Sequence, residues 1–306
     1  MAATPFQMPR VLAWEVTRRC PMRCRHCRAG AADAPFADEL STEECFRVVD
    51  SLAADGKGPM VIWTGGEPMT RPDLVELVRR ATAKGLRSAI APCGLLATPA
   101  RLRELKEAGA MAASFSLDGA DAARHDAFRG VSGAFDAVAR AMAAAREAGL
   151  PFQANVTLSK LNAADFEAIY EMAIARGATR VDAFFLVPVG RGRALDDAVL
   201  SDAEVAAFLA RTEARRAAGK IKCTCCPQAG TCIGGRGFAF LSHVGRLQTC
   251  GFVETPCGNV RDFGCDFRAL VAAAENPLGA CGNCRADRPP AIGLQTKTEG
   301  EGHGAN

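Results

Sequence analysis

Three cysteines near the N-terminus, Cys20, Cys24 and Cys27, have the spacing C-x3-C-x2-C. Three thiolates on one short loop can bind three irons of a [4Fe-4S] cluster and leave the fourth iron open to an exchangeable ligand. Zinc is an alternative, but it would need a fourth ligand within a few residues, and the adjacent His26 is badly spaced. The spacing therefore favours an iron-sulfur cluster, while zinc and buried free cysteines stay open.

A second motif, Thr-Gly-Gly-Glu-Pro at residues 64–68, follows the next apolar run along the chain. Alone it would be an ordinary turn from a strand into a helix, because glycine tolerates positive φ and proline can open a helix. Together the two motifs resemble the radical S-adenosylmethionine (SAM) superfamily. The resemblance implies that the three cysteines hold a [4Fe-4S] cluster whose open iron chelates the methionine part of SAM, and that Gly65, Gly66 and Glu67 bind the SAM amino group.

Further segments are similar to places where members of this family contact the SAM carboxylate and ribose. The resemblance assigns these contacts to Ser116, Asp118, Arg129 and Asn155, although ordinary turns at strand ends would explain the same segments. Where many relatives have Thr-Asn-Gly, this chain has Pro-Cys-Gly, which directs the Cys93 thiol toward the expected substrate cavity. Cys93 is thus a candidate catalytic residue, and a small buried apolar side chain is the alternative.

The C-terminal cysteines resemble the SPASM and twitch auxiliary domains of radical SAM enzymes. Cys232 is followed by 12 residues and then by a glycine, four residues and Cys250, and a C-x2-C pair comes later at Cys281 and Cys284. The resemblance implies that these four thiolates hold one auxiliary [4Fe-4S] cluster, with tetrahedral zinc as the alternative.

The chain departs from the full SPASM pattern, because Pro290 and Leu294 occupy positions where further cysteines would follow. A second auxiliary cluster of the usual kind is therefore not expected. Cys226 precedes Cys232 with five residues between them, which resembles an extra auxiliary ligand of SPASM relatives, and no role is assigned to Cys223, Cys225, Cys257 and Cys265.

Composition limits the class of protein. With 306 residues, 49% of them hydrophobic, the chain can form a large domain and a small one. The formal charge of +3 makes nucleic acid or an anionic membrane an unexpected partner. No apolar stretch approaches the roughly 20 residues that a membrane helix needs, and no export signal is evident at the N-terminus. We expect a cytoplasmic protein whose 14 cysteines stay reduced and serve metal binding or catalysis.

Apolar runs alternate with amphipathic helical patterns from residue 11 to about residue 218, which is typical of repeated βα units around a parallel sheet. The expected strands cover residues 11–17, 60–64, 87–91, 113–117, 152–158 and 181–187. Six such units can close into an open, partial (β/α)6 barrel or form a flat doubly wound sheet, and periodicity does not distinguish the two. The superfamily resemblance implies the partial barrel.

Helix boundaries follow from local signals. Ser-x-x-Glu capping boxes begin at Ser41 and Ser201, and Thr98 and Asn162 are further expected helix starts. The expected C′ glycines are Gly109, Gly149 and Gly177.

We predict four regions. These are a partial barrel at 1–200, a helical connector at 201–222, an auxiliary-cluster domain with short hairpin strands at 223–290 and a disordered tail at 291–306.

Three segments, at residues 14–20, 125–135 and 185–192, look like the haem-tailoring branch of the superfamily, which includes Fe-coproporphyrin III decarboxylase and didecarboxysirohaem deacetylase. The resemblance implies reductive cleavage of SAM to a 5′-deoxyadenosyl radical, with a flavodoxin or ferredoxin as electron donor and a porphyrin-like substrate that is decarboxylated or deacetylated. One alternative is a maturase that modifies peptides. Another is a non-catalytic, cysteine-rich metal-binding scaffold.

Overall fold

The computed structural model describes residues 4–224 and 234–276. Its main element is a 10-stranded sheet with the order β11-β10-β9-β2-β3-β4-β5-β6-β7-β8. The strands from β2 to β8 are parallel and adjacent in chain order. Their bounds are β2 Val11–Thr17, β3 Met60–Gly65, β4 Arg87–Ile90, β5 Ala110–Ser116, β6 Phe152–Leu158, β7 Val181–Phe185 and β8 Ile221–Thr224.

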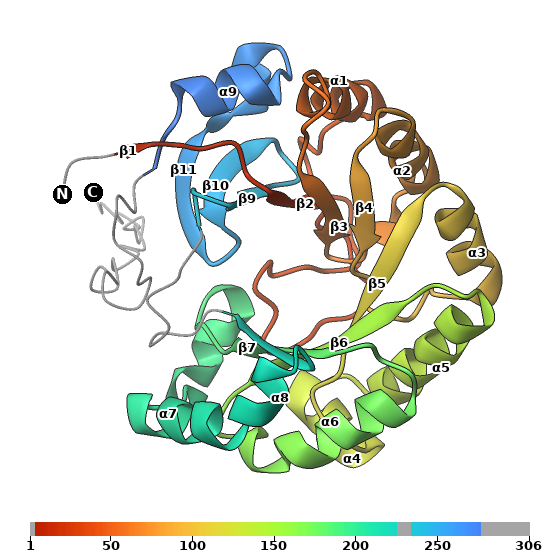
Figure 1. Cartoon of the computed structure of the whole chain (residues 1–306), viewed down its shortest axis with the longest axis vertical. Coiled ribbons are helices and arrows are strands. Elements are labelled where there is room, and N and C mark those ends of the chain that lie inside the picture. Colours follow the sequence, from red (N-terminus) through yellow and green to blue (C-terminus); the bar gives the residue numbers. More distant parts are fainter. Residues whose placement is uncertain (1–3, 225–233, 277–306) are drawn as a thin grey trace, which may run out of the picture.

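The sheet curves, and the helices that connect its strands lie around its outer side (Figure 1). These helices are α1 Thr42–Leu52, α2 Leu74–Ala83, α3 Pro99–Glu107, α4 Ala122–Arg129, α5 Ala134–Glu147, α6 Phe166–Ala175, α7 Asp202–Arg211 and α8 Glu213–Ala217. The 3-10 turns η1 Pro68–Thr70, η2 Ala163–Asp165 and η3 Gly190–Ala198 precede or join them. A doubly wound sheet would reverse its strand order, so the fold is the partial barrel.

The side chains of each strand alternate between the helix layer and the inside of the barrel. Trp14 on β2 stacks on Trp63 of β3 at 5.4 Å between ring centroids, and both belong to the core that Val48 of α1 and Leu77 of α2 complete. Glu15, the neighbour of Trp14, therefore faces the inside. The apolar positions fix which residues of each strand point at a ligand.

The expected helix boundaries are largely confirmed. Both capping boxes are present, Thr98 Oγ1 caps α3, and Gly109, Gly149 and Gly177 all have positive φ directly after a helix end.

The helical segment expected after Asn162 does begin there, as the 3-10 turn η2 that leads into α6, but Asn162 does not cap it. The helix α6 itself begins at Phe166. The buried Asn162 amide instead donates to the carbonyl oxygens of Asp118 and Thr157, at 3.1 and 2.9 Å, while its Oδ1 accepts from Ser159 N. Asn162 thus joins the ends of β5 and β6, a tertiary role that local sequence does not reveal.

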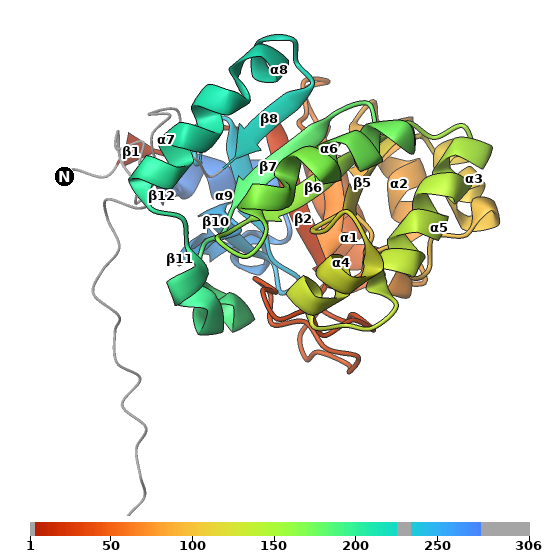
Figure 2. The same ribbon diagram turned by 90° about the horizontal axis from the view of Figure 1, so that it is seen from below.

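The C-terminal strands extend the sheet on its other edge. The strands β9 Phe238–Leu241, β10 Arg246–Cys250 and β11 Val253–Asn259 pair antiparallel in succession, and β9 pairs parallel with β2. η4 Val260–Phe263 and α9 Phe267–Ala273 follow, and β12 Glu275–Asn276 pairs with β1 Thr4–Pro5. In the perpendicular view β9, β10 and β11 lie on the side of β2 away from β4 and β5 (Figure 2). β2, which leads into the three-cysteine segment, is therefore flanked by β3 and β9.

β8 is a seventh parallel strand that the six expected strands do not include, and the four predicted regions stay a prediction, with the tail at 291–306 outside the described residues. Within residues 4–224 and 234–276, no helix has both the length and the apolar character needed to cross a bilayer.

Candidate functional site

Residues 18–30, here called the cluster loop, leave the C-terminal end of β2 and carry Cys20, Cys24 and Cys27. Cys20 and Cys24 are each 6% exposed, and Cys27 is half-buried. The three thiols lie in one apolar cluster that Ala134 and Ala137 of α5 complete. The structure thus places all three cysteines around one water-poor apolar cluster at the mouth of the barrel, although no three Cys, His, Asp or Glu side chains among the described residues converge as a ready metal site.

Hydrogen bonds from Arg191 in η3 connect the cluster loop to the opposite side of the barrel. The Arg191 backbone N donates to Cys27 O at 3.0 Å, its Nε to Cys24 O at 2.8 Å and its Nη1 to Ala31 O at 2.7 Å. A Cβ on Gly190 would lie 2.2 Å from Arg28 O. Sequence reasoning missed this role of Arg191, although the Gly-Arg-Gly sequence after β7 was a signal of a close approach.

Residues 64–68, here called the glycine turn, lie against the cluster loop. Gly66 N donates to Thr17 O and Glu67 N to Arg19 O, both at 2.8 Å. Gly65 has a φ of +150°, and a Cβ on Gly66 would lie 2.4 Å from Arg19 O. Only glycine fits this backbone approach, so the two motifs are parts of one site.

Glu67 is fully buried. Its Oε1 accepts from Met69 N at 2.9 Å and its Oε2 from Cys93 N at 2.5 Å. Burial raises the pKa of Glu67, while the hydrogen bonds from Cys93 and Met69 act in the opposite direction. The carboxyl group is thus held beside the Cys20 and Cys93 thiols by two backbone N–H groups.

Cys93 packs on the same apolar cluster as Cys20 and Cys24. A hydrogen bond to Cys20 raises the pKa of Cys93, as do burial and the nearby Glu67 carboxylate, and the same bond lowers the pKa of Cys20. The Cys93 thiol therefore lies between the first cysteine of the motif and Glu67, and a catalytic role for it stays a prediction.

Asp118 and Arg129 form a buried pair beside the cluster loop. Arg129 Nη1 donates to Asp118 Oδ2 at 2.7 Å and its Nη2 to Cys24 Sγ at 3.3 Å, while Asp118 Oδ1 accepts from Thr157 N at 2.7 Å. Burial acts to raise the pKa of Asp118, but Arg129 and two histidines hold it below its usual value. The pair keeps a charged guanidinium in contact with the three-cysteine site.

We expect Asp118→Asn to destabilise the cluster-free protein by about 3–5 kcal/mol, because it leaves the buried Arg129 charge without its partner. Urea unfolding followed by circular dichroism measures the loss. Glu147→Gln, which removes the exposed partner of Arg103, should leave the urea midpoint unchanged. Equal effects of the two substitutions would contradict the assignment of a buried pair.

Ser116 on β5 and Asn155 on β6 are neighbours in register. They alternate with core residues such as Phe115 and Val156, so they face the inside of the barrel next to Asp118. Asn155 Oδ1 accepts from Gln153 Nε2 at 2.9 Å. The structure thus places both residues on the wall that Asp118 and Arg129 continue.

His26 lies between two of the clustered cysteines in sequence, but its ring turns toward the barrel wall. Its Nε2 is 3.6 Å from Asp118 Oδ2, and its ring packs on Phe128 at 4.8 Å between centroids. Burial lowers the pKa of His26 to about 4, so the ring is neutral at pH 7. Its Nδ1 is buried and has no partner among the described residues, which leaves one polar ring atom for a ligand.

A buried charge network joins the cluster loop to the C-terminal strands. Glu15 is fully buried and accepts from Arg18 Nε and Arg28 Nη2, each at 3.1 Å, while His243 Nδ1 lies 2.8 Å from its Oε1. Arg28 Nη1 also donates to Gly251 O at 3.2 Å. Glu15 therefore connects the segment that carries the three cysteines with the β9–β10 hairpin.

Burial acts to raise the pKa of Glu15, but His243, Arg28 and Arg18 together lower it to about 2. Because the folded pKa lies below the unfolded one, the ionised Glu15 stabilises the fold above about pH 4.5, and this contribution is lost as the pH falls toward 2. We expect the stability difference between wild type and Glu15→Gln, measured by urea unfolding of cluster-free protein, to shrink over that range. A difference that does not change with pH would contradict this account.

The predicted auxiliary ligands are only partly within the described residues. Cys250 ends β10, whereas Cys232, Cys281 and Cys284 lie outside the described residues, as do Cys225 and Cys226. Of the unassigned cysteines, Cys257 lies on β11 with a pKa raised by burial to about 11, Cys265 is buried with a φ of +68° and Cys223 lies on β8. The auxiliary cluster therefore stays a prediction.

Comparison of the sequence with protein families supports the class of site that the two motifs indicate. The family model of the radical SAM superfamily matches residues 14–173, which span β2 to α6 and contain both motifs. The chain belongs to the radical SAM superfamily and is an enzyme. Membership implies SAM and a [4Fe-4S] cluster as cofactors, and it removes the non-catalytic scaffold from the alternatives.

The similarity to the haem-biosynthesis branch is confirmed. The chain is 39% identical over 281 residues to the AdoMet-dependent heme synthase of Nitratidesulfovibrio vulgaris, covering 83% of this chain and 76% of that protein. It is 40% identical over 182 residues to the Fe-coproporphyrin III synthase of Methanosarcina barkeri, covering 60% of this chain and 45% of that protein.

Solved structures share the fold. Streptococcus suis SuiB, bound to S-adenosylmethionine or to the precursor peptide SuiA, superposes with TM-scores of 0.69 and 0.71 at 14% identity. The match covers 89% and 90% of this chain and 67% and 66% of SuiB. At this identity the likeness concerns the fold alone.

Proposed function

We propose that this enzyme forms haem by oxidative decarboxylation of an iron-porphyrin that carries propionate groups, such as Fe-coproporphyrin III. The proposal rests on the length of the match to the AdoMet-dependent heme synthase. This match covers 83% of the chain, which is more than the predicted barrel at residues 1–200 accounts for. The similarity therefore continues past the barrel. Deacetylation of a related precursor is less favoured, since the Fe-coproporphyrin III synthase matches only 60% of the chain.

In this proposal Cys20, Cys24 and Cys27 hold the cluster. Their fit rests on three thiols packed in one apolar cluster and on the Arg129 guanidinium, which offsets thiolate charge at Cys24. When bound there, the cluster and SAM would supply a 5′-deoxyadenosyl radical able to abstract a substrate hydrogen. The chain supplies a site with little water at the C-terminal ends of the barrel strands, which protects a radical from competing hydrogen donors.

The SAM contacts are proposed residue by residue. Gly65 and Gly66 let the glycine turn approach the cluster loop, and the Glu67 carboxylate accepts from the SAM amino group. We assign the SAM carboxylate and ribose to Arg129 and Asp118, which form a buried pair beside the cluster loop. Ser116 and Asn155 continue that wall, next to Asp118.

Conversion of a propionate to a vinyl group releases CO2, one hydrogen atom and one electron. The hydrogen atom goes to the 5′-deoxyadenosyl radical, so the electron needs a separate one-electron acceptor. An auxiliary [4Fe-4S] cluster held by Cys232, Cys250, Cys281 and Cys284 would fill this role. A flavodoxin or ferredoxin is the proposed reductant of the first cluster.

The test uses the full chain, reconstituted anaerobically with iron and sulfide. We expect incubation with SAM, dithionite and Fe-coproporphyrin III to give haem and 5′-deoxyadenosine, both detected by mass spectrometry. Parallel incubation with didecarboxysirohaem tests deacetylation. Cleavage of SAM without conversion of either porphyrin would overturn the haem proposal and leave the radical SAM chemistry intact.

The second candidate is modification of a peptide, which is supported by 37% identity over 177 residues to the PqqA peptide cyclase of Ruegeria pomeroyi, covering 57% of this chain and 46% of that protein. A short precursor peptide encoded beside the gene would then be the substrate. Its modification in the same incubation, with the porphyrins unchanged, would support this candidate.

A further inference from the structure

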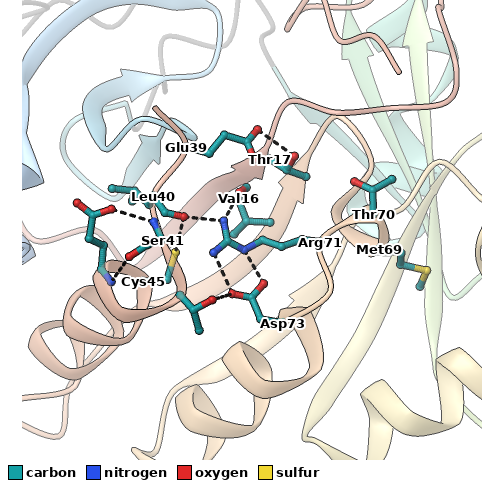
Figure 3. A network of polar contacts seen from close by, with 12 residues as sticks. Val16, Thr17, Glu39, Leu40, Ser41, Cys45, Met69, Thr70, Arg71 and Asp73 are labelled. Carbon is teal, nitrogen blue, oxygen red and sulfur yellow. Dashed lines mark hydrogen bonds and ion pairs between the residues drawn. The ribbon is translucent and has the colours of Figure 1, made fainter. Parts of the chain in front are cut away.

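Arg71, three residues after the glycine turn, has a guanidinium group that is surrounded by acceptors (Figure 3). The side chain is 9% exposed. Its Nη1 donates to Val16 O at 3.0 Å and to Leu40 O at 2.9 Å, and its Nε and Nη2 donate to the two carboxylate oxygens of Asp73 at 2.7 and 2.9 Å. One side chain therefore makes four hydrogen bonds to three separate points of the fold.

The two carbonyl groups flank the cluster loop. Val16 lies on β2, before the loop, and Leu40 lies after it, next to the Ser41 cap of α1. A single nitrogen of Arg71 thus joins the two ends of the segment that carries the three cysteines. Closing this segment at its base restricts the conformations that the cluster loop can adopt.

The same side chain belongs to the element that follows the glycine turn. Arg71 N donates to Pro68 O at 3.0 Å and ends η1. In the glycine turn, Gly66 N donates to Thr17 O and Glu67 N donates to Arg19 O. The guanidinium therefore adds a side-chain connection to the backbone connection between glycine turn and cluster loop.

Asp73 orients the guanidinium from the other side. It is the residue before α2, and its Oδ2 also accepts from Thr42 Oγ1 at 2.6 Å, at the start of α1. Two helix N-termini and the base of the cluster loop are thus fixed around Arg71. A planar guanidinium with donors in a fixed arrangement can satisfy these acceptors together, whereas the ammonium of lysine cannot.

We propose that Arg71 is a positioning residue that fixes the distance between the cluster loop and the glycine turn, and through it the affinity of the assembled site for SAM. The inference rests on the proposed cluster and SAM roles of the two motifs. It predicts a specific defect: Arg71→Lys and Arg71→Met assemble the first cluster, since all three cysteines remain, but bind SAM at least tenfold more weakly.

The measurement is the change that SAM causes in the EPR spectrum of the reduced cluster, titrated with SAM at constant iron content. The matched control is Arg80→Met. Arg80 makes a two-contact ion pair with Asp50, at 3.0 and 2.5 Å, that also joins α2 to α1 but touches neither motif. We expect the control to have the SAM midpoint of wild type.

A wild-type midpoint in Arg71→Met, or an equal shift in Arg80→Met, would overturn the proposal. If Arg71→Met does not fold, two other variants test the proposal in the same titration. Arg71→Lys should shift the SAM midpoint at least tenfold, and Thr42→Val, which removes one hydrogen bond to Asp73, should shift it a few fold. A wild-type protein whose reduced cluster does not respond to SAM would instead refute the proposed cofactor roles.

Discussion

The triple variant Cys20→Ala, Cys24→Ala, Cys27→Ala is expected to lose all SAM cleavage and about half of its iron. If both proposed clusters are four-iron cubes, wild type should bind about eight irons and the variant about four. The reduced variant should give an EPR spectrum that does not respond to SAM, because no iron with an open position remains. Iron analysis, EPR and the yield of 5′-deoxyadenosine measure the three quantities.

Cys45→Ala is the control for this experiment. Cys45 is buried in α1, away from the apolar cluster of the three cysteines, and burial raises its pKa to about 12. The control should keep the iron content and the SAM response of wild type. Retention of all iron in the triple variant, or bound zinc in wild type, would contradict the proposed ligands.

The second large effect is expected for Gly66→Ala. A Cβ at this position would lie 2.4 Å from Arg19 O and 2.5 Å from Arg18 O, distances at which backbone atoms must move. The glycine turn would separate from the cluster loop and carry the Glu67 carboxylate with it. We expect a loss of SAM affinity of at least 100-fold, a cost of about 3 kcal/mol, measured by equilibrium binding to the reconstituted protein.

Gly219→Ala separates this contact from a general effect of alanine. Gly219 has a φ of +67°, and a Cβ there meets nothing within 4 Å. The control should cost about 1 kcal/mol of stability through its backbone conformation and leave SAM binding unchanged. If Gly66→Ala binds SAM as wild type does, the close approach of the two motifs is not required for binding.

Local signals predicted much of the barrel. β2 and β6 have the expected bounds, and the capping boxes at Ser41 and Ser201 begin α1 and α7 as expected, because each depends on residues close in sequence. β8 was missed because Ile221 is the one strongly apolar residue of its four. Its pairing with β7 follows from tertiary packing.

The side chains that support the two motifs were harder to predict from the sequence than the motifs themselves. The two motifs can be recognised from their residue spacing. The bonds that Arg191, Arg71 and Glu15 make to the cluster loop and its flanks cannot, because they join residues up to 167 positions apart, as Arg191 and Cys24 are. No local pattern specifies such pairs. The choice between a barrel and a doubly wound sheet had the same limit, since helix and strand periodicity is identical in both.

The position of β2 has a consequence for biosynthesis. One edge of β2 pairs with β3, which the ribosome makes soon after β2, but the other edge pairs with β9, which is made only after all the strands from β3 to β8. Until then the strand that leads into the cluster loop presents unpaired backbone groups, a condition that favours aggregation. Pairing across so many residues is also slow. The strand that leads into the cluster loop is therefore paired on both edges only after the barrel strands β3 to β8 have been made.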